Sequence, residues 1–218
     1  GSMTAIRTAP TPGCWRRAAI VSAGALLLSG LAFADVRLAP IFSDGAVLQR
    51  DQPIAIWGTA DAGEAIRVEF KRDAATTEAD ARGAWRVVLP ARAGTSEGSE
   101  LVVTGKNKTI CRDVLVGDVW WCSGQSNMEF TVASAQDAAR EIAGANFPGI
   151  RHLKIGRQLA DTPREDFTAA GWKAATPAAV GAFTAAGYFF AREVHTRTGI
   201  PIGLVNCTWS GTPIEPWM

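Results

Sequence analysis

One serine lies where the sequence predicts a sharp turn from a strand into a helix. Residues 119–128 read Val-Trp-Trp-Cys-Ser-Gly-Gln-Ser-Asn-Met. Residues 114–122 are mostly apolar and rich in β-branched and aromatic side chains, which predicts a buried strand, and residues 127–143 follow a helical pattern. Ser126 would then start a helix, where unpaired N–H groups and the helix dipole favour negative charge. This position suits a nucleophile whose reaction forms an oxyanion.

The same spacing also fits a purely structural role for Ser126. Glu129 follows it three residues later, which is the pattern of a capping box. In that motif the hydroxyl accepts a hydrogen bond from a backbone N–H and the glutamate reaches back to the cap. The spacing alone favours the cap, because such caps are common at helix starts. The choice between the two roles depends on the rest of the chain.

The first 34 residues are predicted to be a two-residue cloning scar followed by a signal peptide. Three arginines precede an apolar run at residues 18–31, and residues 32–34 form a small-x-small cleavage site. The 14-residue run is too short to span a bilayer, so we expect a removable signal, with an uncleaved anchor as the alternative. The mature protein would begin near Asp35, be periplasmic or extracellular, and have no membrane attachment.

Composition argues against nucleic-acid and metal binding. Residues 1–34 hold three of the 22 basic residues and none of the 21 acidic ones, so the remainder carries a small net negative charge. It has no basic run of the kind that binds nucleic acid. Cysteines and histidines show no metal-ligand spacing, so no metal or other cofactor is expected.

Two of the later cysteines, Cys122 and Cys207, fall near the ends of predicted strands. A disulfide between them is an alternative in an exported protein. Free, packed thiols are the favoured state, because isolated buried cysteines are more often unpaired.

The chain changes texture near residue 114. Residues 35–113 contain short β-like runs separated by turn residues, which predicts an N-terminal β-sandwich. The predicted strands are 46–49, 54–58, 65–70, 84–90 and 100–105, and the predicted breaks are 61–63, 81–83 and 94–98. Residues 114–218 alternate strands and helices instead, which predicts βαβ units and a parallel sheet. The elements of this second part are strands at 114–122, 150–155 and 200–206, and helices at 127–143 and 184–198.

Ligands of parallel sheets bind at the carboxyl ends of the strands. Ser126 and the loop from Trp209 to Thr212 each follow a predicted strand, so we expect them at the same edge. Three strands do not make a stable doubly wound domain. We therefore expect the α/β domain to be incomplete in this chain.

A serine nucleophile needs a general base, which is usually a histidine. The chain has two histidines. His195 lies in the last turn of the helix predicted at 184–198 and is expected to be solvated and structural. His152 lies in a predicted strand and is also expected to be structural. Neither histidine is a convincing catalytic base.

Three blocks of the chain resemble the sialate O-acetylesterase and related carbohydrate acetylesterase group. They are residues 117–128, Pro-Ile-Gly-Leu at 201–204 and Gly-Thr-Pro-Ile-Glu-Pro-Trp at 211–217. The group consists of GDSL/SGNH serine hydrolases with a flavodoxin-like α/β/α fold and often an N-terminal β-domain. The resemblance covers about residues 36–218. It implies that residues 114–218 are the first part of such a domain, and it favours Ser126 as the nucleophile.

The resemblance assigns two catalytic residues. Ser126 matches the nucleophile, and its backbone N–H would be one oxyanion donor. Gly211 matches the glycine of the second block, whose N–H would be another donor, because glycine allows close approach of a substrate. The family usually has Trp-Gly-Gly-Thr where this chain has Trp-Ser-Gly-Thr. The later asparagine and the Asp-x-x-His block have no counterpart here, so we expect a missing C-terminal segment or a second polypeptide to carry them.

The reaction implied is hydrolysis of acetyl esters on a sugar, such as sialic acid, xylan or xyloglucan, through an acyl-enzyme. Trp209, Trp217 and Gln125 are the candidate substrate-binding residues, since aromatic faces pack against sugar rings. Trp120 and Trp121 are expected in the core. Glu129 and Glu215 are expected to cap or fix loops.

Two other functions stay open. In the first, the chain is a secreted carbohydrate-binding or interaction module without catalysis, and Ser126 is only a cap. In the second, it is a lipase or peptidase. The second is disfavoured because residues 124–128 lack the second glycine of a nucleophile elbow.

Overall fold

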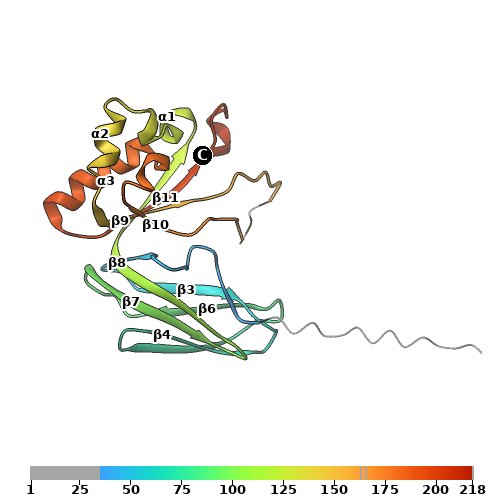
Figure 1. Cartoon of the computed structure of the whole chain (residues 1–218). Coiled ribbons are helices and arrows are strands. Elements are labelled where there is room, and N and C mark those ends of the chain that lie inside the picture. Colours follow the sequence, from blue (N-terminus) through green and yellow to red (C-terminus); the bar gives the residue numbers. More distant parts are fainter. Residues whose placement is uncertain (1–34, 163, 165, 218) are drawn as a thin grey trace, which may run out of the picture. The chain divides into compact units, whose positions relative to one another are not determined.

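The structure is a computed structural model that describes residues 35–162, 164 and 166–217. The predicted scar and signal peptide at residues 1–34 lie outside the described residues. The described residues form one compact unit with two β-sheets and mixed α/β structure, mostly strand (Figure 1). Over the described part of the chain, no helix is both long and apolar enough to cross a membrane.

The smaller sheet has the strand order β1-β3-β6, and its pairs are antiparallel. Its strands are β1 (Arg37–Leu38), β3 (Ile54–Thr59) and β6 (Ala84–Leu89). The larger sheet has the order β10-β9-β11-β8-β7-β4-β5, with β2 also paired to β8. Its strands are β2 (Val47–Gln49), β4 (Ala65–Phe70), β5 (Asp73–Glu78), β7 (Thr95–Thr104), β8 (Lys108–Gly124), β9 (Phe147–Lys154), β10 (Lys173–Ala175) and β11 (Ile202–Thr208).

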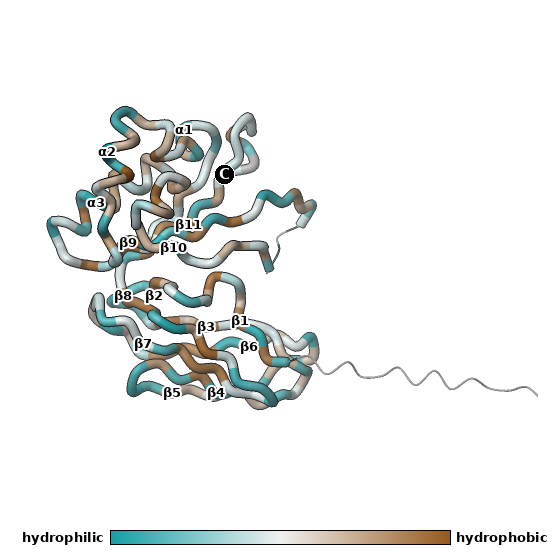
Figure 2. The backbone as a smooth tube through the Cα atoms, in the orientation of Figure 1, coloured by the Kyte–Doolittle hydropathy of each residue, from teal (hydrophilic) through white to brown (hydrophobic). Residues whose placement is uncertain are grey.

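The two sheets share one apolar core, as predicted for the first half of the chain. Along β4 the side chains of Ile66, Val68 and Phe70 are buried, and the residues between them point away. Ile56 of the smaller sheet and Leu101 of β7 belong to the same core. Figure 2 shows hydrophobic stretches along these strands. The period of two therefore sets which face of each strand is buried.

Two details of this region differ from the prediction. The strand β5 is missed, because its sequence Asp-Ala-Ala-Thr-Thr-Glu has no apolar alternation; its pairing with β4 places it in the sheet. The predicted break at 94–98 is wrong, since β7 begins at Thr95. Its pairing with β8 is irregular there, with register shifts on both sides of Ser99. Backbone pairing thus overrides the turn propensity of glycine and serine.

Strand β8 runs through both halves of the chain. Its first half pairs with β7 and β2, and its second half, from Asp118 to Gly124, pairs in parallel with β11. The predicted strand at 114–122 is confirmed as part of it. The predicted domain boundary between residues 113 and 114 falls inside β8, where Asp113 has a left-handed backbone (φ 55°). That boundary stays a prediction.

The second half contains a parallel sheet covered by a helix. Strand β11 lies between β8 and β9 and is parallel to both. Helix α3 (Ala185–Thr198) begins after Thr184, whose side chain accepts a hydrogen bond from the N–H of Gly187, and it ends at Gly199 with φ 70°. Its buried residues share a second core with β9 and β11. The helix predicted at 184–198 is confirmed, whereas a flavodoxin-like arrangement of the whole domain stays a prediction.

The helix predicted at 127–143 is wrong. The chain forms three short pieces there, α1 (Ser126–Glu129), η1 (Val132–Ser134) and α2 (Ala138–Ala143). The helix stops at Phe130 because the chain turns extended and Thr131 forms a β-bridge with Thr184. A left-handed residue, Asp137, separates the later pieces. Tertiary pairing therefore limits α1 to one turn.

Candidate active site

Ser126 and the Trp209–Thr212 loop lie at the same edge of the parallel sheet. Gly124, the last residue of β8, is in register with Thr208, the last residue of β11. The backbone N–H of Trp209 donates to the carbonyl of Gly124 at 3.0 Å. Both segments therefore leave adjacent strands at their carboxyl ends (Figure 1), as the sequence predicted.

A glycine and a glutamine determine how Ser126 is presented. Gly124 has φ 130°, a conformation that side chains rarely adopt, and it turns the chain out of β8. Gln125 is the N-cap of α1, and its Oε1 accepts from the Ser126 N–H at 3.0 Å and from Ser126 Oγ at 2.8 Å. Ser126 is exposed as the first residue of the helical turn. The capping-box prediction for Ser126 is therefore wrong, because Gln125 is the cap.

Gln125 thus occupies both groups of Ser126 that would act on an ester. A carboxamide oxygen orients the hydroxyl but is not a base at neutral pH. An ester that uses the N–H of Ser126 must displace this oxygen. Gln125 therefore contacts Ser126 at the candidate site, and its role in substrate binding stays a prediction.

Gly211 presents its backbone to open space. It has φ 79°, and among the described residues other than its two chain neighbours, no heavy atom lies within 4 Å of the position that a Cβ would take. The loop around it is fixed by Thr212, whose hydroxyl donates to the Trp209 carbonyl at 2.8 Å and accepts from Trp217 Nε1 at 2.8 Å. Trp217 therefore helps to fix the loop, whereas Glu215 is exposed in η3 (Glu215–Trp217) and its loop-fixing role stays a prediction.

Glu129 joins the two segments. Its Oε2 accepts from the backbone N–H of Ser210 at 2.7 Å, and its Oε1 lies 2.5 Å from Arg157 Nη2 and 3.5 Å from Lys154 Nζ. Burial would raise the pKa of this carboxyl, but hydrogen bonds from Ser210 and Arg157 and the charge of Lys154 outweigh it and lower the pKa to about 2. The loop-fixing role predicted for Glu129 is confirmed, with Ser210 as its partner.

His152 is buried, and its ring contacts Phe183 and Asn206. Its ring stacks on Phe183 with centroids 4.4 Å apart, and Nε2 lies 3.0 Å from Asn206 Nδ2, so it accepts from that amide. Burial, and then the charge of Lys154, lower the pKa of His152 to about 4. The ring is therefore neutral at neutral pH. The structural role predicted for it is confirmed.

His195 is half-buried rather than solvated, which corrects the prediction. Its Nδ1 lies 2.7 Å from the carbonyl of Ile200, and its ring packs edge-on against Phe147. In the part of the chain that the structure describes, neither histidine forms a hydrogen bond with Ser126.

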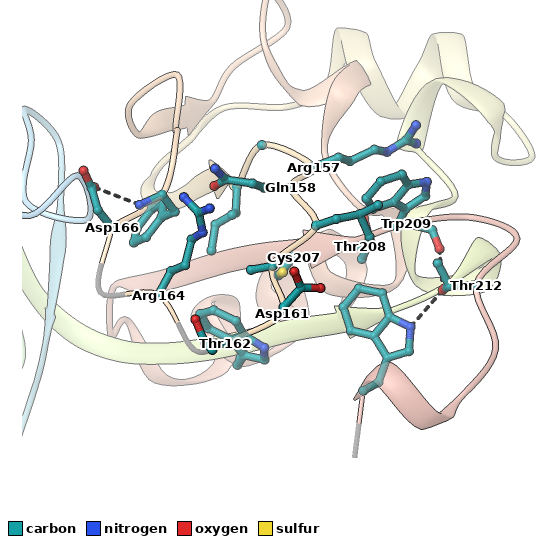
Figure 3. A pocket seen from close by; sticks show the side chains of 17 residues that line it. Arg157, Gln158, Asp161, Thr162, Arg164, Asp166, Cys207, Thr208, Trp209 and Thr212 are labelled. Atoms are coloured by element: carbon teal, nitrogen blue, oxygen red, sulfur yellow. Dashed lines mark hydrogen bonds between the residues drawn. The ribbon is translucent and has the colours of Figure 1, made fainter.

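A hollow of about 600 Å³ lies beside the Gly211 loop. Trp209 and Trp217 line it, as do charged side chains of the segment that follows β9 (Figure 3). Ser126 and Gly211 do not line it. The charged lining residues are Arg157, Asp161, Arg164 and Asp166.

The tryptophans of β8 are exposed, so their predicted place in the core is wrong. Trp121 is 60% exposed and lines the same hollow, and Trp120 packs edge-on against Phe190 at 4.8 Å. The cause is an open strand edge: within the described ranges, only β11 pairs with β8 from Asp118 onward.

Comparison with known proteins places this site in a family. Residues 116–218 match the family described as "Carbohydrate esterase, sialic acid-specific acetylesterase". This part of the chain belongs to the sialic acid-specific acetylesterase family. The chain is 32% identical over 200 residues to sialate O-acetylesterase of Homo sapiens and 33% identical over 203 residues to that of Rattus norvegicus. Both matches cover 83% of this chain, and they cover 38% and 37% of the two relatives, respectively.

A solved structure of the same kind agrees. It is XAC1771, described as a novel carbohydrate acetylesterase from Xanthomonas citri, with a TM-score of 0.81 and 47% identity. The match covers 84% of this chain and 42% of that one. This family member therefore spans less than half the length of these relatives, and it shares the fold of the Xanthomonas citri protein over the matched part.

Three polar residues at this edge of the sheet were not predicted from the sequence. Lys154, Asn206 and Thr208 form a half-buried to buried polar cluster behind the loop. Lys154 Nζ lies 3.2 Å from Asn206 Oδ1, and Thr208 Oγ1 donates to the same oxygen at 2.8 Å. A signal did exist: each is a polar residue at the carboxyl end of an apolar strand, where ligand sites gather.

The three cysteines that the structure describes, Cys111, Cys122 and Cys207, are free. Cys122 packs in the core beneath α3, whereas Cys207 packs against the core of the two sheets, so the two thiols lie on opposite faces of the parallel sheet. The alternative disulfide is therefore wrong. Among the described residues, no group of three acidic, histidine or cysteine side chains gathers as metal ligands would.

Proposed function

We propose that the complete protein is an exported carbohydrate O-acetylesterase with Ser126 as its nucleophile. The observation that carries this proposal is the position of Ser126 and Gly211 at the carboxyl ends of two adjacent parallel strands. Membership of the acetylesterase family supports the reaction, and the predicted signal peptide supports export. The proposed substrates are acetylated sugars such as sialic acid or the hemicelluloses xylan and xyloglucan.

In the proposed reaction Ser126 Oγ attacks the acetyl carbonyl after Gln125 Oε1 has moved aside. The N–H groups of Ser126 and Gly211 bind the oxyanion of the tetrahedral intermediate. The base takes the proton of Ser126 Oγ and gives it to the sugar oxygen as the ester bond breaks, which leaves an acetyl-enzyme that water then hydrolyses to acetate. The described histidines are held elsewhere, so we propose that the Asp-x-x-His block of a further segment or second polypeptide supplies the base.

The sugar is proposed to bind beside the loop that carries Gly211. Trp209 and Trp217 line the hollow there, and their ring faces can pack against a sugar ring. Acetate release from a panel of acetylated glycans would identify the sugar. A secreted binding module without catalysis is the competing function, and the tryptophan-lined hollow is the observation in its favour.

The test is Ser126→Ala in the complete protein, assayed with p-nitrophenyl acetate. The esterase proposal predicts that kcat falls by about 10³-fold or more while the circular dichroism spectrum stays unchanged. Ser134→Ala is the matched control, because Ser134 is exposed in the next helical piece, η1. Unchanged turnover in Ser126→Ala would overturn the proposal, and glycan binding without turnover would support the binding module.

A further inference from the structure

We propose that Glu129 is a positioning residue that fixes the distance between the two oxyanion donors, the N–H groups of Ser126 and Gly211. The proposal rests on the esterase function proposed above. It assigns to Glu129 no contact with the reacting atoms. In this role the Glu129 carboxylate holds the loop that carries Gly211 against the helical turn that begins at Ser126.

A hydrogen bond links α1 directly to the loop that carries Gly211. Glu129 ends α1, the single turn that Ser126 begins, and its Oε2 accepts from the N–H of Ser210 at 2.7 Å. Ser210 directly precedes Gly211 in the chain. Hydrogen bonds from backbone N–H groups to a carboxylate are short and about twice as strong as neutral ones. The carboxylate therefore holds the peptide next to the second donor.

Two cations balance the charge of Glu129 and hold its side chain in place. Its side chain is only 17% exposed, and its other oxygen contacts two cations, Arg157 at 2.5 Å and Lys154 at 3.5 Å. A half-buried carboxylate is stable only when it is paired and hydrogen-bonded in this way. Its partners are therefore two cations and Ser210, which donates a hydrogen bond to it, so the carboxylate stays ionised and oriented.

Lys154 is in turn bonded to β11, the strand that precedes the loop. Lys154 Nζ lies 3.2 Å from Asn206 Oδ1 and 3.4 Å from the carbonyl of Thr208, and both of these residues are buried in β11. The loop is thus held at two successive residues. The N–H of Trp209 donates to the Gly124 carbonyl, and the N–H of Ser210 donates to Glu129. Gly211 itself faces open space, so its position depends on these neighbours.

These contacts fit positioning rather than acid or base chemistry. Glu129 forms no hydrogen bond with the Ser126 side chain, whose partner in the described structure is Gln125. Both Glu129 oxygens are occupied by donors. Removal of one oxyanion donor typically lowers kcat by 10²–10³-fold, and a displaced loop loses part of that donor. We therefore expect Glu129→Ala to lower kcat by about 10- to 100-fold and KM to change little.

The experiment compares Glu129→Ala and Glu129→Gln in the complete protein. The amide of Gln keeps an acceptor for the Ser210 N–H, so we expect it to restore part of kcat. Glu141→Gln is the matched control, because Glu141 has an 18% exposed side chain and a similar ion pair, with Arg192, but lies on α2 away from the loop. We expect its kcat to equal that of the wild type.

Two results would overturn the proposed positioning role of Glu129. One is an unchanged kcat in folded Glu129→Ala. The other is an increase in KM alone, which would indicate a substrate contact. A second measurement does not need activity. Amide hydrogen exchange at residues 209–212 should be at least several-fold faster in Glu129→Ala than in Glu141→Gln. Equal exchange would also overturn the proposal. Activity of the wild type and of Ser126→Ala separately decides the esterase function, so the two failures are distinguishable.

Discussion

The region predicted as a β-sandwich, in which the two sheets share a core, and the carboxyl edge of the parallel sheet are stabilised by different interactions. In the sandwich, apolar side chains such as Ile56, Phe70 and Leu101 are fully buried between two sheets. At the edge, the loop that carries Gly211 is exposed and is fixed by hydrogen bonds to Gly124 and Glu129. Burial is not directional and supports the whole fold, whereas these bonds fix one local geometry. Mutations should therefore separate stability from activity.

The largest effect is expected in the sandwich. Phe70 is 0% exposed, so Phe70→Ala should lower the free energy of unfolding by about 3–5 kcal/mol through lost burial and an unfilled cavity. Urea unfolding would measure it. In the complete protein, the activity of each folded molecule should stay unchanged.

Val88→Ala is the control for Phe70→Ala. Val88 lies on β6 of the same sandwich but is 52% exposed, so its loss should change stability by no more than about 0.5 kcal/mol. A folded Phe70→Ala protein with reduced kcat would show that the sandwich affects the site directly. That result would remove the contrast between the two regions.

The second-largest effect concerns pH and comes from His152 on β9. The pKa of His152 is lowered by burial to about 4 from its ordinary 6.5, so between these values the unfolded chain binds a proton that the folded chain does not. The free energy of unfolding should therefore fall as pH drops from 6.5 to 4, by roughly 3 kcal/mol in total. Urea unfolding at several pH values would measure the slope.

His152→Gln removes this titration and should flatten the slope over that window. The carboxyl of Glu129, whose pKa is about 2 against an ordinary 4.5, contributes its own loss of stability as pH falls from 4.5 to 2. The two windows therefore separate the groups. An unchanged slope between pH 6.5 and 4 in His152→Gln would contradict the assignment to His152.

The smallest effect is expected at the loop. Gly211→Ala places a side chain at φ 79°, which costs about 1–2 kcal/mol and is relieved when the loop shifts. In the complete protein kcat should fall about tenfold, with little change in melting temperature. Gly199→Ala is the matched control, because Gly199 has φ 70° and the same open space but ends α3. Equal activity of the two variants would argue against Gly211 as a donor.

Much of the fold was predictable because burial leaves a periodic pattern. The strand at Ala65–Phe70 alternates in the sequence as it does in the sheet. The strand β5 and the short α1 were missed for a common reason: pairing with distant residues decides them. Thr131 is not helical because it forms a β-bridge with Thr184. The spacing of apolar residues near Thr131 does not indicate this distant contact.

For the candidate site, the order of strands along the chain predicted which segments meet, but not the contacts between them. Two segments that follow adjacent parallel strands must meet at one edge, and Ser126 and the Gly211 loop do so. The bond from Ser210 to Glu129 spans 81 residues, and the exact turn at Gly124 decides that Gln125 rather than Ser126 is the cap. Such contacts depend on side-chain geometry that periodicity does not encode.

The most direct test of the central claim is to trap the acetyl-enzyme. The complete protein would be mixed with an acetyl ester, quenched in acid within the first turnovers and mapped by peptide mass spectrometry. We predict the added mass of one acetyl group on the peptide that contains Ser126, and its absence in Ser126→Ala. Acetate release with the acetyl group on another residue, or on none, would contradict the account.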